Sequence, residues 1–417
     1  MSTEKKFNIN VSWLKNPKFI YKRLWEIITE NEGLSDRNKL NFSYNKNKIN
    51  LNLGDPFQKD VAKKSCENKG SLCIGHGGVG KSYTLELIVK MKIEQEYIVH
   101  IIAFTHAAVS NINHCSPNGA NTIQHFILNI IPKIKRDVAS GKKIALVIDE
   151  ASMIPMHFWV ILAALKFLHV EFYIFGDWAG QFKPIFLEDQ KWETMDSSDF
   201  LHDLCNGLKI NFKKFRRGTD LDHFKFTTSI YHTDLESALK KAREKYPDKK
   251  TSVKTTLCVT NKFRKHINFM ENRTEYKEHK HDGVFLECKS NLRKAQAMYV
   301  WPGLILQSCC SEKQSNKKFH YDLKNGLFYK IKKFDKETMT FIKLDKDMND
   351  TIIEFSIPID EVPAKLLLCY AYTYHKSQAR TIKGSIRLAQ TDHTYFSLRH
   401  LVVGLGRDPL GQDVQVA

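Results

Sequence analysis

The segment 75–82 has residue types and a spacing that suit phosphate binding: Gly75-His76-Gly77-Gly78-Val79-Gly80-Lys81-Ser82. Its glycines let the backbone curl, so that several N–H groups and the start of a helix point at one anion. In such a loop the lysine reaches the β- and γ-phosphates, and the hydroxyl after it takes a position on Mg²⁺. A flexible turn alone would not explain an eight-position match. We therefore predict a nucleotide site formed by Gly75, Gly77, Gly78, Val79, Gly80, Lys81, Ser82 and Tyr83.

Two adjacent carboxylates, Asp149 and Glu150, follow the apolar run 144–148. At the carboxyl end of a buried parallel strand, Asp149 would hold Mg²⁺ through water, and Glu150 would deprotonate the water that attacks the γ-phosphorus. Acidic residues at strand ends are common, so this pair indicates a catalytic site only in combination with the phosphate-binding loop upstream. Together the two segments predict hydrolysis of ATP with Mg²⁺, and not binding alone.

Apolar runs alternate with helical patterns from residue 53 to about residue 208, which predicts a parallel β-sheet covered by helices. The expected strands are 71–74, 98–104, 144–148 and 172–175. The same texture returns at 255–260 and 365–373 and predicts a second α/β domain. Between them, short alternating runs and the turn-forming pair Asn325-Gly326 predict a small β-barrel. Its expected strands are 298–306, 327–334, 340–344 and 351–357.

The composition favours a polyanionic partner. The chain has 417 residues, enough for two core-forming domains, and carries a net charge of +18. Nucleic acid is the first candidate for such a partner and a membrane surface the second. No apolar segment suits a membrane span and no secretion signal opens the chain, so we expect a soluble, intracellular protein. The nine cysteines lack paired spacing and predict neither a zinc ribbon nor a disulfide framework.

Four further segments carry residues suited to phosphate chemistry: 175–185, 214–217, 373–378 and 404–407. The first two resemble the Gly-Asp-x-x-Gln motif and the Phe-Arg-Gln segment of superfamily 1 helicases. The third is similar to their Thr-x-His-Lys-Ser-Gln-Gly motif, with Ala379 in place of the last glycine. The fourth stands in the place of the last, arginine-bearing motif. As a set, the segments resemble most closely the Pif-type and RecD-like branch of that superfamily.

This resemblance covers about residues 53–408 and implies an α/β fold. It implies two RecA-like parallel-sheet domains of the P-loop NTPase kind, with a small SH3-like β-barrel inserted in the second. The expected division is a basic N-terminal extension over 1–52, a first domain over 53–210, a second domain over 211–295 and 363–417, and the β-rich insertion over 296–362.

Four residues outside the phosphate-binding loop are expected to assist catalysis or nucleotide binding. Phosphoryl transfer spreads negative charge over the equatorial oxygens, so a hydrolase needs cations that arrive when the two domains close. We expect Arg216 and Arg407 to supply them from the second domain, with Arg217 as the alternative to Arg216. Gln181 would bind the attacking water or the γ-phosphate, or would only cap a loop. Gln58 stands in the place of the glutamine that reads adenine in the resembled family.

Single-stranded nucleic acid is held by hydroxyls, amides and cations on its phosphates and by aromatic rings that stack on its bases. Segments 104–108 and 121–126 resemble the strand-contacting motifs of the first helicase domain. The expected strand contacts are Thr105, His106, Thr122, His125, Thr373, His375 and Ser377. The stacking candidates, two of which are expected in the core, are Phe104, Phe126, Trp178 and Tyr374. The insertion offers Lys317, Lys318, Lys330, Lys332 and Lys333, either as a grip on the strand or as a solvated face.

Together these features predict an ATP-dependent DNA helicase that translocates on single-stranded DNA and unwinds duplex at junctions. By the resemblance, the direction is 5′ to 3′. RNA stays open as a partner, no membrane is expected, and a monomer is favoured. Two alternatives remain: a viral superfamily 1 RNA helicase, and a non-unwinding ATP-gated clamp or packaging protein. The motif at 373–378 and the barrel insertion favour DNA, and the departures from consensus suit a viral or mobile-element replication protein.

Overall fold

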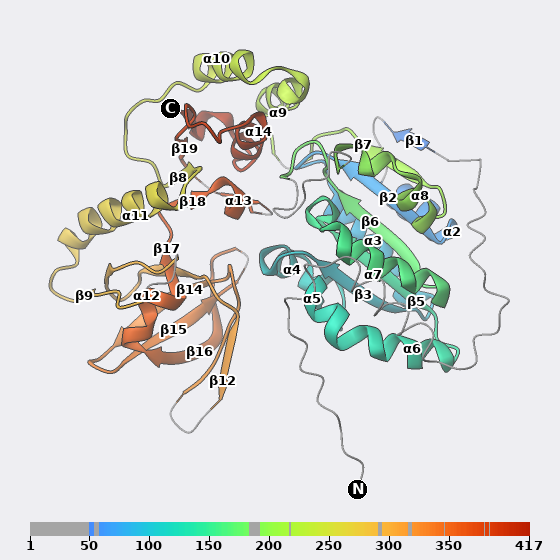
Figure 1. The fold of residues 1–417 in the computed structure, drawn as a ribbon, viewed down its shortest axis with the longest axis horizontal. Helices are drawn as coiled ribbons and strands as arrows, with labels where there is room; N and C mark the ends of the chain where they lie inside the picture. The colour runs from blue at the N-terminus through green and yellow to red at the C-terminus, as the bar shows by residue number, and fades with distance from the viewer. Residues whose placement is uncertain are drawn as a thin grey trace, which may run out of the picture.

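The structure is a computed structural model that describes residues 50–53, 58–182, 192–216, 218–290, 294–315, 319–345, 347–378, 380–382 and 384–417. In this part, the chain forms two units with a parallel sheet each, and an antiparallel insertion extends from the second unit (Figure 1). The predicted N-terminal extension, 1–52, lies almost entirely outside the described residues. None of the described helices is both long and apolar enough to cross a membrane.

The first unit is built on a seven-stranded parallel sheet in the order β1-β7-β2-β6-β5-β3-β4. Its strands are β1 (Asn50–Leu53), β2 (Gly70–Gly75), β3 (Ile98–Ala103), β4 (Ala120–Thr122), β5 (Ile144–Asp149), β6 (Glu171–Gly176) and β7 (Lys209–Phe212). Its helices are α2 (Gln58–Glu67), α3 (Lys81–Glu94), α4 (His106–Ile112), α5 (Ile123–His125), α6 (Ile131–Ala139), α7 (Met156–Ala163) and α8 (Asp199–Leu204).

The central strands of this sheet, β2, β3, β5 and β6, are largely apolar because both of their faces are covered. In β5, Leu146 and Ile148 point into one core, which α6, α7 and α8 complete. Ala145 and Val147 point into the other core, which α2, α3 and α4 complete. Alternate residues of a strand face opposite sides, so a strand buried on both faces reads as a continuous apolar run. This is why the sequence pattern locates β2, β3, β5 and β6, whereas the short, partly polar strands β1, β4 and β7 are not among the expected ones.

The second unit has a four-stranded parallel sheet in the order β18-β8-β19-β20. Its strands are β8 (Thr255–Cys258), β18 (Ala371–Thr373), β19 (Ile386–Leu388) and β20 (Val414–Val416). Its helices are α9 (Leu221–Ser229), α10 (Leu235–Lys245), α11 (Asn261–Glu275), α13 (Tyr374–Ser377) and α14 (Leu398–Leu405). The predicted fold class of two parallel-sheet α/β units is therefore confirmed.

The insertion is an antiparallel sheet in the order β16-β15-β14-β11-β17. Its strands are β11 (Ile305–Ser308), β14 (Phe328–Phe334), β15 (Thr338–Leu344), β16 (Asp350–Pro358) and β17 (Leu366–Leu368), and the helix α12 (Val362–Lys365) precedes β17. Two strand pairs flank the sheet, β9 (Val284–Leu286) with β10 (Met298–Val300) and β12 (Glu312–Ser315) with β13 (His320–Leu323). Its SH3-like character stays a prediction.

Three predicted boundaries differ from the observed ones. The division at 210/211 cuts through β7, which pairs with β2, so the first unit extends to Phe212. The insertion begins before residue 296, because β9 pairs with β10. The apolar run 365–373 is two strands in two sheets: β17 pairs with β11 of the insertion, whereas β18 pairs with β8 of the second unit. A continuous apolar run does not reveal that the chain changes sheets within it.

A buried ion pair joins α3 to β6 in the first unit. Lys92 is 1% exposed, and its Nζ lies 2.7 Å from Oε2 of Glu171, which is 6% exposed. The hydroxyls of Tyr97 and Tyr173 also donate to the Glu171 carboxylate, at 2.8 and 2.6 Å. Burial, with the Glu171 carboxylate beside it, raises the pKa of Tyr97 to about 12. The charge on Glu171 is thus compensated by one cation and two hydroxyl donors.

Lys92→Met should lower the free energy of unfolding by about 3–5 kcal/mol, because it leaves the buried Glu171 carboxylate without its cation. Chemical denaturation measures the effect. The matched control is Lys64→Met, which removes an exposed ion pair to Asp60 and should cost at most about 1 kcal/mol. Equal losses in the two variants would contradict the assignment of Lys92 and Glu171 as a stabilising pair.

Candidate active site

The phosphate-binding loop lies between β2 and α3. Strand β2 ends at Gly75 and α3 begins at Lys81, so the first N–H groups of the helix border the loop. A side chain at Gly75 would place its Cβ 2.7 Å from the carbonyl oxygen of Phe212 in β7. At Gly80, φ is +87°, a left-handed value that favours glycine. The backbone path of the loop therefore requires glycine at Gly75 and favours it at Gly80.

Lys81 holds its ammonium group inside the loop. Nζ donates to the carbonyl oxygens of Gly75 at 2.6 Å and His76 at 2.9 Å. Ser82 and Tyr83 are exposed on the first turn of α3. Gln58, at the start of α2, donates from Nε2 to the carbonyl oxygen of Gly80 at 3.3 Å. The structure therefore brings the predicted adenine-reading glutamine against the predicted phosphate loop.

The two predicted carboxylates lie at the same edge of the sheet as the loop. Strand β6 pairs with both β2 and β5, and the carboxyl ends of parallel strands share one edge. Asp149 is 7% exposed. Burial and the neighbouring Glu150 raise the pKa of Asp149 to about 7, and Lys81 opposes this shift. The Ser82 hydroxyl and the Asp149 carboxylate are oxygen donors of the kind that Mg²⁺ takes, and Mg²⁺ would favour the ionised carboxylate.

Glu150 is held in place by Gln181 and Ser152. Its own backbone has φ +51°, which is uncommon for a residue other than glycine. The Gln181 amide donates from Nε2 to Oε2 of Glu150, and the Ser152 hydroxyl donates to Oε1 of Gln181. Ser152 also accepts from the backbone N–H of Asp177 at 3.3 Å. Ser152 was not among the predicted site residues, and its place three residues after Asp149 is the only sequence signal for it.

Asp177 and His76 form a second polar pair at the loop. The Nδ1 of His76 lies 3.7 Å from Oδ1 of Asp177, which also accepts from the N–H of Gly180 at 2.8 Å. Burial works against ionisation of Asp177, but His76, Lys81 and the Gly180 N–H outweigh it and hold the pKa of Asp177 below its usual value. The His76 ring stacks on Tyr231 of the second unit, with centroids 4.4 Å apart.

Both predicted catalytic arginines lie close to the loop, but they belong to different units. Arg216 follows β7 of the first sheet, so it does not come from the second unit as expected. Its backbone N–H donates to the Gly78 carbonyl at 2.8 Å, and its NH1 donates to the Val79 carbonyl at 3.0 Å. Its guanidinium therefore contacts the loop before any domain closure. Arg217 lies outside the described residues.

Arg407 comes from the second unit, directly after α14. Its guanidinium donates to the carbonyl oxygens of Val403, Ser377 and Arg380 at 2.9 to 3.3 Å. It lines a cavity together with His76 and Gly77 of the loop, Asp177, and Tyr231. One cavity beside the loop is thus lined by residues of both units.

Arg216→Ala should lower kcat for ATP by about 10³-fold with little change in ATP affinity, because an arginine of this kind acts on transition-state charge. Steady-state ATPase kinetics and nucleotide titration separate the two parameters. Arg217→Ala is the matched variant and should be mild. If Arg217→Ala lowers kcat strongly and Arg216→Ala does not, the catalytic role belongs to Arg217.

The strand-contact residues of the first unit gather at one sheet edge. Strands β4 and β5 flank β3, with Ala103 opposite both Thr122 and Asp149. The hydroxyl of Thr105 caps α4 by accepting from the N–H of Ala108 at 3.1 Å, and the hydroxyl of Thr122 caps α5. His125 is exposed beside them. The edge that carries the predicted catalytic carboxylates therefore continues into the predicted strand contacts.

His106 connects this edge to the insertion. Its Nε2 lies 3.0 Å from the hydroxyl oxygen of Ser311, just before β12. Burial lowers the pKa of His106, and the nearby Lys324 contributes in the same direction. The imidazole therefore favours its neutral form, which can accept a hydrogen bond from a hydroxyl or donate one to a phosphate. The first unit and the insertion meet at a predicted strand contact.

In the second unit, the predicted strand contacts are mostly covered. Ser377 is fully buried and donates to the Tyr374 carbonyl at 2.8 Å, so the predicted nucleic-acid contact of its side chain does not hold in this conformation. Thr373 is 8% exposed. The His375 ring stacks on Phe182 of the first unit, with centroids 3.9 Å apart, and burial lowers its pKa. The Phe182 ring thus covers one face of His375, which is half-buried.

Three of the four stacking candidates are core residues. Phe126 and Tyr374 are fully buried, and Trp178 is 4% exposed. Phe104 is half-buried and remains available for stacking. Phe126, Trp178 and Tyr374 were predicted to stack on bases because they are aromatic and lie in motifs. Neither property distinguishes a stacking residue from a core residue.

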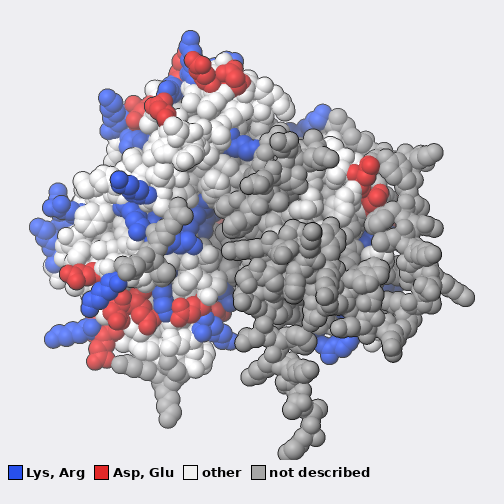
Figure 2. Space-filling view, in the orientation of Figure 1, with Lys and Arg blue, Asp and Glu red and all other residues white. Residues whose placement is uncertain are grey.

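The charges of the insertion are largely compensated. Lys330 pairs with Asp350, and Lys332 lies 2.7 Å from Glu354. Figure 2 shows basic and acidic side chains interspersed over the insertion, at the lower left of the view. Lys333 is exposed, whereas Lys317 and Lys318 lie outside the described residues. The pairing favours a solvated charged face at Lys330 and Lys332 over a grip on phosphates.

One further contact joins the two units at the Gly-Asp-x-x-Gln segment. Arg399, at the start of α14, donates from NH1 to the Trp178 carbonyl at 3.1 Å and to the Gln181 carbonyl. The side chain of the same Gln181 donates to Glu150. Arg399 of the second unit therefore bonds to the backbone of Gln181, and the side chain of Gln181 bonds to the predicted catalytic base, Glu150. Motif position gave no reason to expect Arg399.

Comparison with known proteins agrees with this arrangement. The family described as AAA domain matches residues 58–186. No curated protein matches the chain. The Pif1 helicase of Candida albicans is 18% identical, with a TM-score of 0.58 over 87% of this chain and 94% of that one. Bacteroides Pif1 bound to ssDNA is 17% identical, with a TM-score of 0.54 over 87% and 92%.

A Bacteroides Pif1 in complex with ADP-AlF4 is 16% identical, with a TM-score of 0.52 over 86% of this chain and 91% of that one. At these identities the likeness is one of fold. It covers both parallel-sheet units and nearly the whole of each relative. The resemblance to the Pif-type branch that the motifs predict is therefore confirmed at the level of the fold.

Proposed function

We propose that this chain, which has the fold of the Pif1 helicases, is an ATP-driven superfamily 1 DNA helicase. The observation that carries the proposal is the cavity between the two units. There the loop residues His76 and Gly77 lie beside Asp177 of the first unit and beside Tyr231 and Arg407 of the second. A nucleotide bound at such a boundary can change how the units sit, and hydrolysis can reverse that change.

The chemical step assigns a role to each residue around the loop. Lys81 neutralises charge on the β- and γ-phosphates, and Ser82 and Asp149 are placed to hold Mg²⁺, which would neutralise developing charge on the phosphates. Glu150 accepts the proton of the attacking water, and Gln181 orients that water while it holds Glu150. Arg216 and Arg407 stabilise the transition-state charge. Gln58 contacts adenine.

Single-stranded DNA is proposed to cross the sheet edges that Thr105, His106, Thr122 and His125 form in the first unit, with Thr373 and His375 in the second. The net charge of +18 supports binding to phosphates. One structural relative, a Bacteroides Pif1, is bound to ssDNA, which supports DNA over RNA. Movement 5′ to 3′ and unwinding at duplex junctions are part of the proposal and rest on the resemblance to the Pif-type branch.

Phe182 supports a switch between two arrangements of the strand site. Its ring covers His375, which is a proposed phosphate contact of the second unit. Phe182 follows Gln181, the residue that contacts Glu150. A change at the γ-phosphate that moves Gln181 would therefore also move the ring that covers His375. Nucleotide state and strand access are thereby linked through two consecutive residues.

Arg399→Ala should reduce the stimulation of ATP hydrolysis by single-stranded DNA about 5-fold or more, with a smaller effect on basal hydrolysis. Its guanidinium joins α14 to the Trp178 and Gln181 carbonyls, and a coupling of about 1–3 kcal/mol between sites corresponds to this range. ATPase rates with and without DNA measure the effect. Arg243→Ala, which removes guanidinium bonds to Thr391, Asp392 and the Ala417 carbonyl away from the Gly-Asp-x-x-Gln segment, is the control. Equal loss of basal and stimulated rates would place Arg399 in the catalytic step instead.

The test of the proposed function is ATPase activity with and without single-stranded DNA and RNA, followed by strand displacement on duplexes with a 5′ or a 3′ tail. DNA-stimulated hydrolysis with displacement on the 5′-tailed DNA is the expected result. Stimulation by RNA with displacement of RNA would establish the viral RNA helicase alternative. Stimulation without displacement on any substrate would establish an ATP-gated clamp.

A further inference from the structure

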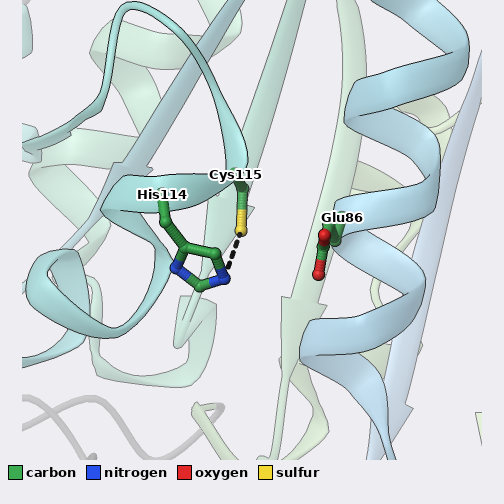
Figure 3. Close-up of side chains that lie close together, drawn as sticks. All are labelled: Glu86, His114 and Cys115. Carbon is green, nitrogen blue, oxygen red and sulfur yellow. Dashed lines mark hydrogen bonds between the residues drawn. The ribbon is translucent and has the colours of Figure 1, made fainter.

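Three side chains with metal-binding atoms meet on the first unit, away from the ATP cavity. Glu86 belongs to α3, and His114 and Cys115 belong to the single turn that follows α4, at Asn113–Cys115. One atom from each lies within 4.8 Å of the other two. Figure 3 shows the imidazole and the thiol projecting from this turn toward the carboxylate on α3. No motif in the sequence marks the group, because Glu86 is far from the other two in the chain.

The turn that presents His114 and Cys115 is fixed by its own hydrogen bonds. The side-chain oxygen of Asn113 accepts from the N–H of Ala120 at 2.9 Å, where β4 begins. Gly119 has φ +67°, and a Cβ there would lie 2.7 Å from the same Asn113 oxygen. Cys115 is 8% exposed and packs in the core that α3 and α4 share, whereas His114 is exposed. The two side chains are therefore presented by a defined turn.

The separation of the sulfur and the nitrogen fits tetrahedral coordination. Zinc binds thiolate sulfur at about 2.3 Å and imidazole nitrogen at about 2.0 Å, so two such ligands of one tetrahedral ion lie about 3.5 Å apart. Sγ of Cys115 and Nε2 of His114 are 3.8 Å apart. A carboxylate oxygen of Glu86 lies within 4.8 Å of both ligand atoms. We propose that Glu86, His114 and Cys115 bind Zn²⁺, with water as the fourth ligand.

The donor set selects the class of metal. A thiolate and an imidazole beside one carboxylate suit zinc and related late divalent ions, whereas Mg²⁺ prefers oxygen donors alone. The site is thus separated by chemistry, as well as by position, from the Mg²⁺ position expected at Ser82 and Asp149. Binding must release the thiol proton of Cys115, so the affinity should fall as the pH falls.

Lys90 competes with the metal for Glu86. Its Nζ lies 2.9 Å from Oε1 of Glu86, one helical turn further along α3. Without metal, this ammonium compensates the carboxylate. A bound cation must displace or share it, so removal of the Lys90 charge should strengthen metal binding. If the three side chains form no metal site, the Lys90 variant should show no change in metal binding.

Bound zinc would connect α3 to the turn that follows α4. Helix α3 begins at Lys81 of the phosphate-binding loop, and α4, which begins after Thr105, leads directly into the turn at Asn113–Cys115. A metal that bridges α3 and this turn would resist separation of the two helices. We expect it to raise the Tm of the protein, and this expectation does not depend on the helicase proposal.

The test uses the full chain, stripped of metal with a chelator and titrated with Co²⁺ and Zn²⁺ in excess Mg²⁺. One equivalent of Co²⁺ should give a thiolate-to-cobalt absorption band that Zn²⁺ abolishes. The band should disappear in Cys115→Ser and persist in Cys288→Ser, the half-buried control cysteine. Loss of an outer-shell partner alone weakens metal sites about 10–100-fold, so His114→Ala and Glu86→Gln should weaken Zn²⁺ binding by at least this much.

Lys90→Ala should tighten Zn²⁺ binding several-fold, whereas Lys63→Ala, which removes an exposed charge on α2, should leave it unchanged. A wild-type protein without the thiolate band, or a band that survives Cys115→Ser, would overturn the proposal. If Cys115→Ser does not fold, His114→Ala decides the question, because its exposed imidazole can be removed without a change in the core. An unchanged Zn²⁺ affinity in that variant would also overturn it.

Discussion

Lys81→Ala should reduce ATP hydrolysis by about 10²–10³-fold or more, because it removes the cation that stabilises charge developing on the transferred phosphoryl group. In the structure the ammonium already lies at the loop, bonded to the Gly75 and His76 carbonyl oxygens. We expect bound ATP to replace these neutral acceptors with phosphate oxygens. Steady-state hydrolysis in saturating single-stranded DNA measures the loss.

The same variant should bind single-stranded DNA within about twofold of the wild type, because the proposed strand contacts lie on other elements and phosphate contacts there are independent. Lys63→Ala, on the exposed side of α2, is the control for loss of a positive charge. Near-normal turnover in Lys81→Ala would remove the proposed nucleotide site. Parallel loss of DNA binding would show that the two sites share this residue.

Glu150→Gln should lower kcat by about 10²–10⁴-fold and leave ATP affinity nearly unchanged, since a general base acts on the attacking water and not on the bound nucleotide. The Glu150 carboxylate accepts from Nε2 of Gln181, and the amide that replaces it can keep a hydrogen bond to that side chain. The expected protein is thus trapped with ATP. Titration with a fluorescent ATP analogue, beside single-turnover hydrolysis, separates affinity from chemistry.

Glu67→Gln, an exposed carboxylate on α2, is the matched control for Glu150→Gln. Glu150→Gln also tests the electrostatics of the site, because the Glu150 charge contributes to the raised pKa of Asp149. Its removal should shift the pKa of Asp149 downward, so the metal site should fill at lower pH. Turnover close to that of the wild type would assign the base to another residue.

The central strands of the first sheet and the loop were predictable because local rules decide them. Strand β5 reads as a continuous apolar run, since both of its faces are buried, and the loop before Lys81 contains Gly75 and Gly80 where its backbone favours glycine. Once the strands are known to be parallel, the shared edge of Asp149 and the loop follows. These inferences need no knowledge of how distant segments pack.

The contacts between the units were not predictable in this way. Tyr231 stacks on His76, and Arg399 bonds to Gln181, through tertiary packing that neither periodicity nor spacing encodes. Ser377 fits a phosphate-binding motif by identity, yet its hydroxyl is directed into the core. Arg216 was expected on the second unit because the short, polar-interrupted strand β7 gave no clear signal that the first sheet continues to Phe212.

The position of the insertion within the chain has a consequence for how the protein folds. Thr256 of β8 pairs with Ala371 of β18, 115 residues further along (371 − 256), and the whole insertion lies between them. Pairing across so long a loop is entropically costly and slow. An insertion that folds first pairs β11 with β17 and so delivers the adjacent β18 close to its partner. Damage to the insertion core should therefore appear as slow, aggregation-prone folding of the second unit, even where the finished ATP site is intact.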